Sequence, residues 1–505
     1  MSARPEPASD PAPSEPGAPA ADAGRPPASL RADGPPAPLR ADGPPAPLRA
    51  DGPPAPAPLS GWGRFPVLPA HRAAPADTQA AAALLRRQGE GIAPRGLGRA
   101  YGDAALPPAT GLGLAVETAR LDRFVSFDPG TGVLVAESGV SLGEIATALL
   151  PRGWFPAVVP GTRFVSLGGA IAADVHGKNH HAPGGGSFGD HVEWVELMGA
   201  DGALTRLAPG DPGFAETCGG MGLTGFITRA AIRLRRVESG WLRQETVRAA
   251  NLDAAMDLIE ASDGWTHASA WIDCLSTGRE LGRSILYRAE DAGYEELDAT
   301  CKLDRWALKA QEKSLGPPPD LIPGFALNLI TMRAFNALYW AGGGRAERRG
   351  PALVDWGKCF HPLDAVLGWN RIYGRRGFVQ FQCALPPETA RKGLRAMLET
   401  TSAAGQGSFL AVLKALGEGR EGPSLSFPRR GWTLALDFPA TPRAFFVIER
   451  LHRLTADHGG RVYLAKDARM TAAEFAATEP RAPAFRASPA RARAFATALA
   501  RRLDL

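Results

Sequence analysis

The chain has 505 residues, of which 45% are hydrophobic and 22% are charged, the composition of an ordinary globular protein with more than one domain. No stretch of 18 apolar residues and no basic, apolar leader occurs, so we expect no transmembrane helix and no secretory signal peptide. The net charge of +5 is scattered along the chain and does not indicate nucleic acid. Five separated cysteines without a CxxC pair predict reduced core residues rather than disulfides or a zinc site.

A proline-rich tail precedes the rest of the chain. Residues 1–58 hold 18 of the 46 prolines and no aromatic residue, and residues 30–56 repeat the unit LRADGPPAP three times. Such a segment buries too little apolar surface to offset the entropy that ordering costs. We therefore expect residues 1–58 to be disordered and order to begin near Leu59.

Short strands, short helices and glycine-rich loops are predicted in the next region. Apolar residues alternate at 124–127 and 133–136 around the turn sequence DPGTG, which predicts a β-hairpin. Ser141 and Glu144 form a capping box, and Pro151 ends the short helix that it starts.

Longer helical patterns begin after about residue 240. We expect helices at 252–259, 303–313 and 387–401 and a strand at 378–385. These elements indicate a second region of the α+β class.

The sequence RGLGRAYGD at 95–103 holds three glycines within seven residues. Consecutive backbone N–H groups can turn toward one anion there, with Arg95 or Arg99 adding positive charge. A Rossmann fingerprint would have to open a helix, which Pro107 and Pro108 exclude. The segment predicts a pyrophosphate loop of another fold, or otherwise a tight surface turn.

Two further segments carry small residues beside polar ones. In PGTRFVSLGGAIAADVHGKNHH, at 160–181, small residues let the backbone approach a flat ligand, and His176 follows as a titratable group. Three histidines within six residues could indicate a metal, but no carboxylate pattern completes a ligand set. The sequence GGMGLTG at 219–225 predicts either another close backbone approach or a bend in a strand.

These motifs, with FHPLDAVLGWNRIYG, GFVQFQ, SFPRRGW and VYLAKDAR, resemble in order and spacing the decaprenylphosphoryl-β-D-ribose 2′-oxidases, flavoproteins of the vanillyl-alcohol-oxidase (PCMH-type) superfamily. The resemblance covers about residues 59–505. It implies an α+β, two-domain PCMH-type fold. An FAD-binding domain at 59–240 and a substrate-binding domain at 241–460 would be followed by a segment, 461–505, that returns to the FAD-binding domain.

The resemblance implies FAD-dependent oxidation of the 2′-hydroxyl of a polyprenyl-phospho-β-D-ribose to a ketone. A separate NADH-dependent reductase would then complete epimerisation to the arabinose donor for cell-wall arabinan. We expect a cytoplasmic protein with peripheral contact at the inner face of the plasma membrane. The alternatives are an FAD oxidase of a soluble aldose, alditol or aldonolactone, and a non-catalytic flavin-binding scaffold.

Hydride leaves a secondary alcohol only when the hydroxyl proton is removed or stabilised at the same time. Lys466, in AKDAR, matches the active-site lysine of the family, and Lys414 matches a second lysine in the substrate region. Either could instead be a surface lysine at a strand end. A desolvated ammonium can lose its proton, which a guanidinium cannot. The resemblance thus implies Lys466, Lys414 and His176 as catalytic residues.

The other implied site residues fall into two groups. Contacts to non-covalent FAD are expected from Arg95, Gly96, Leu97, Gly98, Arg99, Ala100, Tyr101, Pro160, Gly161, Thr162, Gly168, Gly169, Ala172, His176, Gly177, Asn179, Gly222, Thr224, Gly225 and Tyr463. Contacts to substrate are expected from Lys178, Ser269, Phe360, Gln380, Gln382, Leu416, Thr433 and Ala435.

Four positions depart from what relatives carry. Arg99 stands where flavinylated relatives have the histidine that links FAD, so we expect releasable FAD. Ala435, Thr433 and Phe360 replace a cysteine, an asparagine and a tyrosine of the family. These three changes alter the substrate wall and leave the cofactor site intact.

An apolar stretch is predicted to accommodate a lipid-linked substrate. It runs from 317–319 through 324–330 to 338–340 and is closed by the glycines and arginine of 342–345. Apolar residues with flanking arginines suit a flap at a membrane surface. An ordinary buried helix is the alternative.

Overall fold

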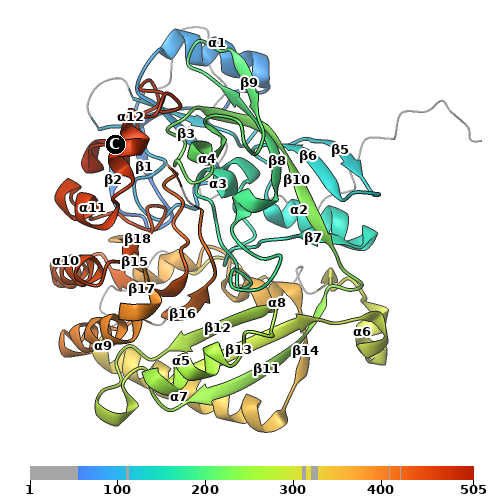
Figure 1. Cartoon of the computed structure of the whole chain (residues 1–505), viewed down its shortest axis with the longest axis vertical. Coiled ribbons are helices and arrows are strands. Elements are labelled where there is room, and N and C mark those ends of the chain that lie inside the picture. The colour runs from blue at the N-terminus through green and yellow to red at the C-terminus, as the bar shows by residue number, and fades with distance from the viewer. Residues whose placement is uncertain are drawn as a thin grey trace, which may run out of the picture. The chain divides into compact units, whose positions relative to one another are not determined.

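A computed structural model of the chain describes residues 55–109, 113–309, 314–319, 328–408, 410–420, 422 and 424–505. Helices pack on three β-sheets in these ranges (Figure 1). This confirms the predicted α+β class. The predicted tail lies outside the described residues up to position 54.

The first sheet has four strands in the order β1 (Ala57–Ser60), β2 (Val67–Ala73), β4 (Leu114–Glu117) and β3 (Ile92–Arg95). Helix α1 (Thr78–Gln88) connects β2 to β3. β1 pairs with β2 antiparallel, whereas β4 is parallel to both of its neighbours. β1 starts slightly before the predicted beginning of order at Leu59, whose side chain is buried.

The second sheet has the order β5 (Phe124–Asp128), β6 (Val133–Glu137), β10 (Phe226–Arg236), β8 (Val192–Met198) and β9 (Leu204–Leu207), with β7 (Trp154–Pro156) paired to β10. Helices α2 (Leu142–Leu149), α3 (Leu167–Ala172) and α4 (Phe214–Thr217) lie within this part of the sequence. β5 and β6 form the predicted hairpin, and Ser141 and Glu144 form the predicted capping box of α2. Both predictions are confirmed.

The third sheet has eight strands. Their order is β14 (Ala352–Asp355), β11 (Trp241–Ala249), β13 (Ser284–Asp291), β12 (His267–Ile272), β16 (Val412–Leu416), β17 (Gly431–Pro439), β15 (Phe378–Leu385) and β18 (Arg461–Val462). Helices α5 (Leu252–Glu260), α9 (Pro387–Ala403) and α10 (Pro442–Asp457) share a hydrophobic core with one face of this sheet. The predictions for α5, β15 and α9 are confirmed.

The two faces of the third sheet differ because side chains alternate along each strand. On β15, Phe381 and Cys383 belong to the core under the helices, whereas Gln380 and Gln382 lie on the opposite face. That opposite face forms part of the cavity described below.

The C-terminal segment contacts both parts of the chain. β18 belongs to the third sheet, and α11 (Ala472–Thr478), α12 (Ala482–Ala487) and α13 (Ala498–Leu503) follow it. Phe495 then forms a parallel bridge with Ile92, and the N–H of Ala498 donates to the carbonyl of Leu106. The domain boundaries at 240 and 460 stay predictions.

The helix predicted at 303–313 is wrong in its described part. α6 covers Ala299–Leu303 and ends there, and residues 310–313 lie outside the described ranges. The indole of Trp241 donates to the carbonyl of Asp304, and Ala307 has a positive φ of 53°. The positive φ of Ala307 is incompatible with a continuing right-handed helix, and the Trp241 contact holds the turn that replaces it.

The apolar stretch contains helix α7 (Leu329–Arg349), followed by α8 (Trp356–Phe360). The glycines at 342–344 lie inside α7 and do not end the apolar stretch as predicted. Gly343 and Gly344 instead let the helix approach the third sheet. A Cβ on Gly343 would lie 2.5 Å from Cδ1 of Ile285 on β13. α7 is not an ordinary buried helix either, since Ile330 and Leu338 are 79% and 72% exposed. Residues 320–327 of the predicted flap lie outside the described ranges.

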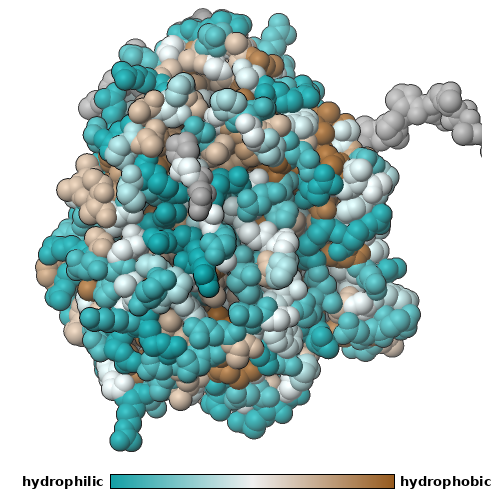
Figure 2. Space-filling view, viewed as in Figure 1, coloured by the Kyte–Doolittle hydropathy of each residue, from teal (hydrophilic) through white to brown (hydrophobic). Residues whose placement is uncertain are grey.

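All five cysteines are buried and free of disulfides, as predicted. Figure 2 shows that the viewed surface is mainly hydrophilic, with small scattered apolar patches. Within the described residues, no helix has both the length and the hydropathy that crossing a membrane requires.

Candidate active site

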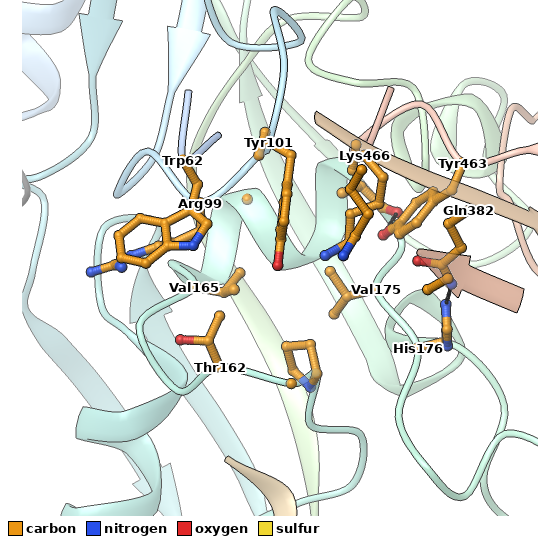
Figure 3. A pocket seen from close by; sticks show the side chains of 18 of the residues that line it. Trp62, Arg99, Tyr101, Thr162, Val165, Val175, His176, Gln382, Tyr463 and Lys466 are labelled. Carbon is orange, nitrogen blue, oxygen red and sulfur yellow. Dashed lines mark hydrogen bonds between the residues drawn. The ribbon is translucent and has the colours of Figure 1, made fainter. Parts of the chain in front are cut away.

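A cavity of about 710 Å³ collects nearly all of the predicted site residues. Its walls come from the loop after β3, the segment around α3, strands β12, β15, β16 and β17, and helix α7. The volume lies in the range of roughly 300–1,000 Å³ that is typical of ligand pockets. Figure 3 shows Trp62 and Arg99 at one side, His176 and Gln382 at the other, and Tyr101 between them.

The glycine-rich loop leaves β3 and continues in turns and bends, without a helix, as predicted. A Cβ on Gly96 would lie 2.1 Å from Oγ of Ser166, and one on Gly102 would lie 2.1 Å from the carbonyl oxygen of Asp467. The loop can therefore pack between α3 and the segment that carries Lys466 only because these positions lack side chains.

The lining fits the cofactor that the motifs predict. A Cβ on Gly168 would lie 2.8 Å from Cβ of Ser138, so the backbone of α3 comes close to its neighbours. The Thr118 hydroxyl is buried in the cavity wall with no hydrogen-bond partner among the described residues, as is Nε of Arg99. Small residues in the cavity wall and buried donors without a partner suit a flat ligand with phosphate groups.

Arg99 lies between two aromatic rings at the edge of the cavity. Its guanidinium is 4.2 Å from the ring centre of Trp62 and 4.9 Å from that of Phe164. Burial lowers the pKa of Arg99 to about 10, against the opposing effect of Asp364. The residue stays cationic at neutral pH and is held in place by cation–π contacts.

At the other side of the cavity, His176 lies beside polar side chains from strands β15, β16 and β17. Nζ of Lys414 lies 3.1 Å from Nδ1 of His176, and the side-chain amide of Gln382 lies 3.2 Å from Nε2. Gln382 also donates to the hydroxyl of Thr433 at 3.1 Å. Burial, followed by the charge of Lys414, holds the pKa of His176 well below its ordinary value. His176 is therefore neutral, with Nδ1 facing Lys414 and Nε2 facing Gln382.

Two of the three lysines in the cavity wall, Lys414 and Lys466, have pKa values near neutral pH. Burial lowers the pKa of Lys414 to about 7, and the charges of Lys178 and Lys466 add to the effect. Burial also lowers the pKa of Lys466 to about 8, while Asp437 opposes the change. A lysine with such a pKa can exchange a proton at neutral pH.

Asp437 is a buried carboxyl on β17 behind the cavity wall. It accepts a hydrogen bond from the side-chain amide of Gln380, and its second oxygen has no partner among the described residues. Burial raises the pKa of Asp437 to about 7, against the lowering effects of Gln380 and Lys466. Asp437 thus adjusts the charge of Lys466 without lining the cavity.

Most predicted site residues lie in the cavity wall. They are Arg95, Gly96, Leu97, Arg99, Ala100, Tyr101, Pro160, Gly161, Thr162, Gly168, Gly169, Ala172, His176, Gly177, Lys178, Gly222, Gly225, Ser269, Phe360, Gln380, Gln382, Lys414, Thr433, Ala435, Tyr463 and Lys466.

Four predicted residues do not line the cavity. Gly98 turns the loop against the Arg95 guanidinium, which would lie 2.7 Å from a Cβ there. Asn179 donates to the carbonyl of Ala157, and the Thr224 hydroxyl accepts from Thr217. Leu416 belongs to the core of the third sheet. The side chains of Asn179, Thr224 and Leu416 are thus engaged away from the cavity, and Gly98 serves the turn of the loop.

The sequence predictions missed an aromatic part of the wall. The missed residues include Trp62, Thr118, Ser166, Trp271, Tyr287, Phe335, Tyr339 and Trp369. One signal was present, because Trp271 lies two positions after Ser269 and so shares its face of β12. Phe335 and Tyr339 are one helical turn apart on α7 and stack on each other at 5.7 Å.

The histidines of the second motif do not gather around one point. His180 accepts from the N–H of Gly417, and His181 contacts the carbonyl of Trp265. Across the described residues, no group of three metal-ligand side chains is arranged to hold an ion.

Comparisons with known proteins agree with this arrangement. A family model described as an FAD binding domain matches residues 69–208. The chain is 36% identical over 461 residues to the decaprenylphosphoryl-β-D-ribose oxidase of Mycolicibacterium smegmatis, an alignment that covers 88% of this chain and 97% of that protein. It is 35% identical over 377 residues to an uncharacterized protein in the mprA 5′ region of Streptomyces coelicolor, covering 72% of this chain and 100% of that protein. The chain belongs to the decaprenylphosphoryl-β-D-ribose oxidase family and is an FAD-dependent oxidoreductase.

Proposed function

We propose that the protein oxidises the 2′-hydroxyl of a polyprenyl-phospho-β-D-ribose to the 2′-keto sugar. The observation that carries this proposal is that one cavity combines the glycine-rich loop with Lys466, Lys414 and His176. The relative from Mycolicibacterium smegmatis is named for oxidation of decaprenylphosphoryl-β-D-ribose. This oxidation would be the first half of an epimerisation that leads to an arabinose donor.

The cofactor would lie along the glycine-rich loop and α3, with Arg99 and Tyr101 beside it. Bound FAD supplies the acceptor for the hydride that leaves C2′ of the ribose. The hydroxyl proton must leave in the same oxidation, so a ketone forms only if a base lies near that oxygen. Lys466 would take this proton, because its lowered pKa leaves a substantial neutral fraction at physiological pH.

Other residues of the wall would orient the sugar. Gln380 and Gln382 present amides from adjacent outward positions of β15, and Thr433 adds a hydroxyl from β17. His176 is neutral and fixed by Lys414, so it can serve as a rigid hydrogen-bonding group. Phe360, Thr433 and Ala435 would set the shape of the substrate wall.

A lipid-linked substrate requires an apolar surface next to the cavity. Phe335 and Tyr339 on α7 line the cavity, and Ile330 and Leu338 of the same helix are exposed. This arrangement supports peripheral contact with the inner face of a plasma membrane. The keto product would then pass to an NADH-dependent reductase, because a ketone must be reduced to complete the inversion at C2′.

A substrate screen under anaerobic conditions tests the proposal. The oxidised holoprotein is mixed with farnesylphosphoryl-β-D-ribose, its arabinose epimer, an alditol and an aldonolactone, and flavin absorbance is followed. We expect bleaching of the flavin band with the phosphoribose. Bleaching only by a soluble sugar would move the assignment to a soluble-substrate oxidase. No bleaching by any compound would indicate a scaffold.

A further inference from the structure

The cavity has an unbalanced charge. Its lining includes five cationic side chains, those of Arg95, Arg99, Lys178, Lys414 and Lys466, and no aspartate or glutamate. Burying cations without anions is costly unless a ligand brings negative charge. Glu117, Asp364 and Asp437 lie behind the wall and act on Arg95, Arg99 and Lys466, so an anionic group of a ligand would be needed most by Lys178 and Lys414.

The two arginines lie at the end with the glycine-rich loop. Arg95 lies 3.7 Å from the carboxylate of Glu117 and donates to the carbonyl of Ser60 at 2.9 Å. Arg99 lies against Trp62, which is on the side of the cavity away from His176 in Figure 3. Any diphosphate bound along the loop would be balanced by this end, which leaves Lys414, beside His176, and Lys178 for another anion.

Lys178 and Lys414 are both held by hydrogen bonds to backbone carbonyls. Nζ of Lys178 donates to the carbonyl of Cys359 at 2.6 Å, and Nζ of Lys414 donates to the carbonyl of Gly177 at 3.1 Å. In the part of the chain that the structure describes, neither ammonium group has a carboxylate among its charge partners. Each keeps donors that backbone carbonyls do not use, because an ammonium carries three N–H groups.

Repulsion between the lysines lowers the pKa of Lys414. Burial lowers the pKa of Lys178, and the charges of Lys178 and Lys466 contribute to the lowered pKa of Lys414. The geometry agrees, because Nζ of Lys414 lies 3.1 Å from the carbonyl oxygen of Gly177, the residue before Lys178. An anion placed between Lys178 and Lys414 would replace this repulsion with attraction.

We propose that Lys178 and Lys414, with the hydroxyl of Ser269, form an anion subsite that binds the phosphodiester of the substrate. This inference rests on the proposed function, in which the phosphate is attached to C1′, next to the carbon that is oxidised. A phosphate held by Lys178 and Lys414 would bring the neighbouring 2′-hydroxyl toward Lys466. The subsite would select phosphorylated ribose over free sugars, and its ammonium groups suit a tetrahedral oxyanion as point donors.

A static titration tests the subsite without turnover. Oxidised holoprotein is titrated with methyl phosphate, and the dissociation constant is read from the perturbation of the flavin band. We expect Lys178→Gln to raise this constant by about 10- to 100-fold, the loss typical of a charge-assisted hydrogen bond. Lys178→Arg should retain most of the affinity because it keeps the charge. Lys392→Gln, at an exposed lysine on α9, is the matched control and should not change it.

Turnover separates the subsite from the reaction. The ratio of kcat/KM for farnesylphosphoryl-β-D-ribose to that for methyl β-D-ribofuranoside should fall by about 10-fold or more in Lys178→Gln, with flavin content unchanged. An unchanged ratio together with unchanged methyl phosphate affinity would overturn the subsite while leaving ribose oxidation intact. Binding of methyl phosphate that requires Lys178, without oxidation of either riboside by the unmodified protein, would instead overturn the proposed function.

Discussion

The ammonium group of Lys466 lies over the ring of Tyr101, 3.7 Å from the ring centre. The backbone supports this contact, because the N–H of Tyr101 donates to the carbonyl of Ala465 at 2.9 Å. The glycine-rich loop and the C-terminal motif AKDAR are thereby joined into one unit. A change in either motif is expected to affect the other.

Lys466→Ala is expected to keep FAD and to lose about 10²-fold or more in the rate of flavin reduction. The loss follows from removing the group that takes the hydroxyl proton. Lys466→Arg should not restore the rate, because a guanidinium does not release its proton at this pH. Rapid-mixing flavin reduction at saturating substrate measures both variants, with Ala435→Cys as a control in the pocket wall. Near-normal reduction in Lys466→Ala would move the role to Lys414 or His176.

The reductive rate is expected to rise with pH and to level off above about pH 8. Burial lowers the pKa of Lys466 to about 8, so its neutral, proton-accepting form increases as the pH passes through that value. The measurement is the limiting rate of flavin reduction between pH 6 and about 9.5, at saturating substrate. A rate that falls as the pH rises would exclude Lys466 as the base. The same rise with pH in Lys466→Ala would also exclude it.

Arg502→Met is expected to destabilise the fold by about 3–5 kcal/mol, because it leaves two buried carboxylates without their partner. Arg502, on α13, pairs with Asp103 at 2.7 Å and with Asp467 at 2.8 Å. It thus fixes the residue after the glycine-rich loop to the residue after Lys466. Thermal unfolding and retained FAD are the measurements, and Arg501→Met, at the exposed neighbour, is the control. Equal melting temperatures for the two variants would contradict the role of Arg502.

The pairing with Arg502 also has a pH dependence of defined sign. Burial raises the pKa of Asp467, but Arg502 and His452 outweigh it, and the pKa lies below its ordinary value. The ion pair of Asp467 and Arg502 therefore stabilises the fold fully above about pH 3.9, the pKa of an unfolded aspartate. This stabilisation is lost as the pH falls through the lower pKa that Asp467 has in the folded protein. In Arg502→Met this part of the acid sensitivity should be reduced.

FAD is expected to be released when the protein is precipitated with acid. The family resemblance implies that Arg99 stands where flavinylated relatives carry a linking histidine, and an arginine does not form that bond. Its guanidinium is held between Trp62 and Phe164, pointing its charge into the cavity end with the glycine-rich loop. Flavin absorbance in the supernatant is the measurement. Yellow colour that stays with the precipitate would contradict the prediction.

Removal of residues 1–54 is expected to leave FAD content and turnover nearly unchanged. Their proline-rich composition provides little apolar surface for a core. Removal of residues 1–60 should reduce FAD content, because it deletes β1 and the Ser60 carbonyl that accepts from Arg95. Flavin absorbance per polypeptide compares the two deletions. Equal loss in both would show that the first 54 residues contribute to the fold.

Local signals predicted local structure well. The hairpin at β5 and β6, the capping box of Ser141 and the strand β15 follow from periodicity and turn chemistry over a few residues. The helix expected at 303–313 was wrong because the chain turns after Leu303, and a contact from the distant Trp241 to the carbonyl of Asp304 holds that turn. Tertiary contacts of that kind leave no local trace in the sequence.

The site was predictable where family motifs carry it and less so elsewhere. The lysines and His176 follow from motif matches, but Phe335 and Tyr339 of the aromatic wall come from α7, whose glycines suggest a break rather than a helix. Asp437 was also missed. Its importance arises from burial beside Gln380 and from its effect on Lys466, and neither is encoded in a short motif.

The glycine at position 343 makes one wall of the cavity depend on how closely α7 lies on the sheet. A larger side chain there would meet Ile285 and lift the helix, moving Phe335 and Tyr339 away from Trp271. Lys466 and the glycine-rich loop lie on other elements and would keep their positions. The size of the admitted molecule and the chemistry performed on it are thus set by separate parts of the chain, and evolution or engineering can broaden one while preserving the other.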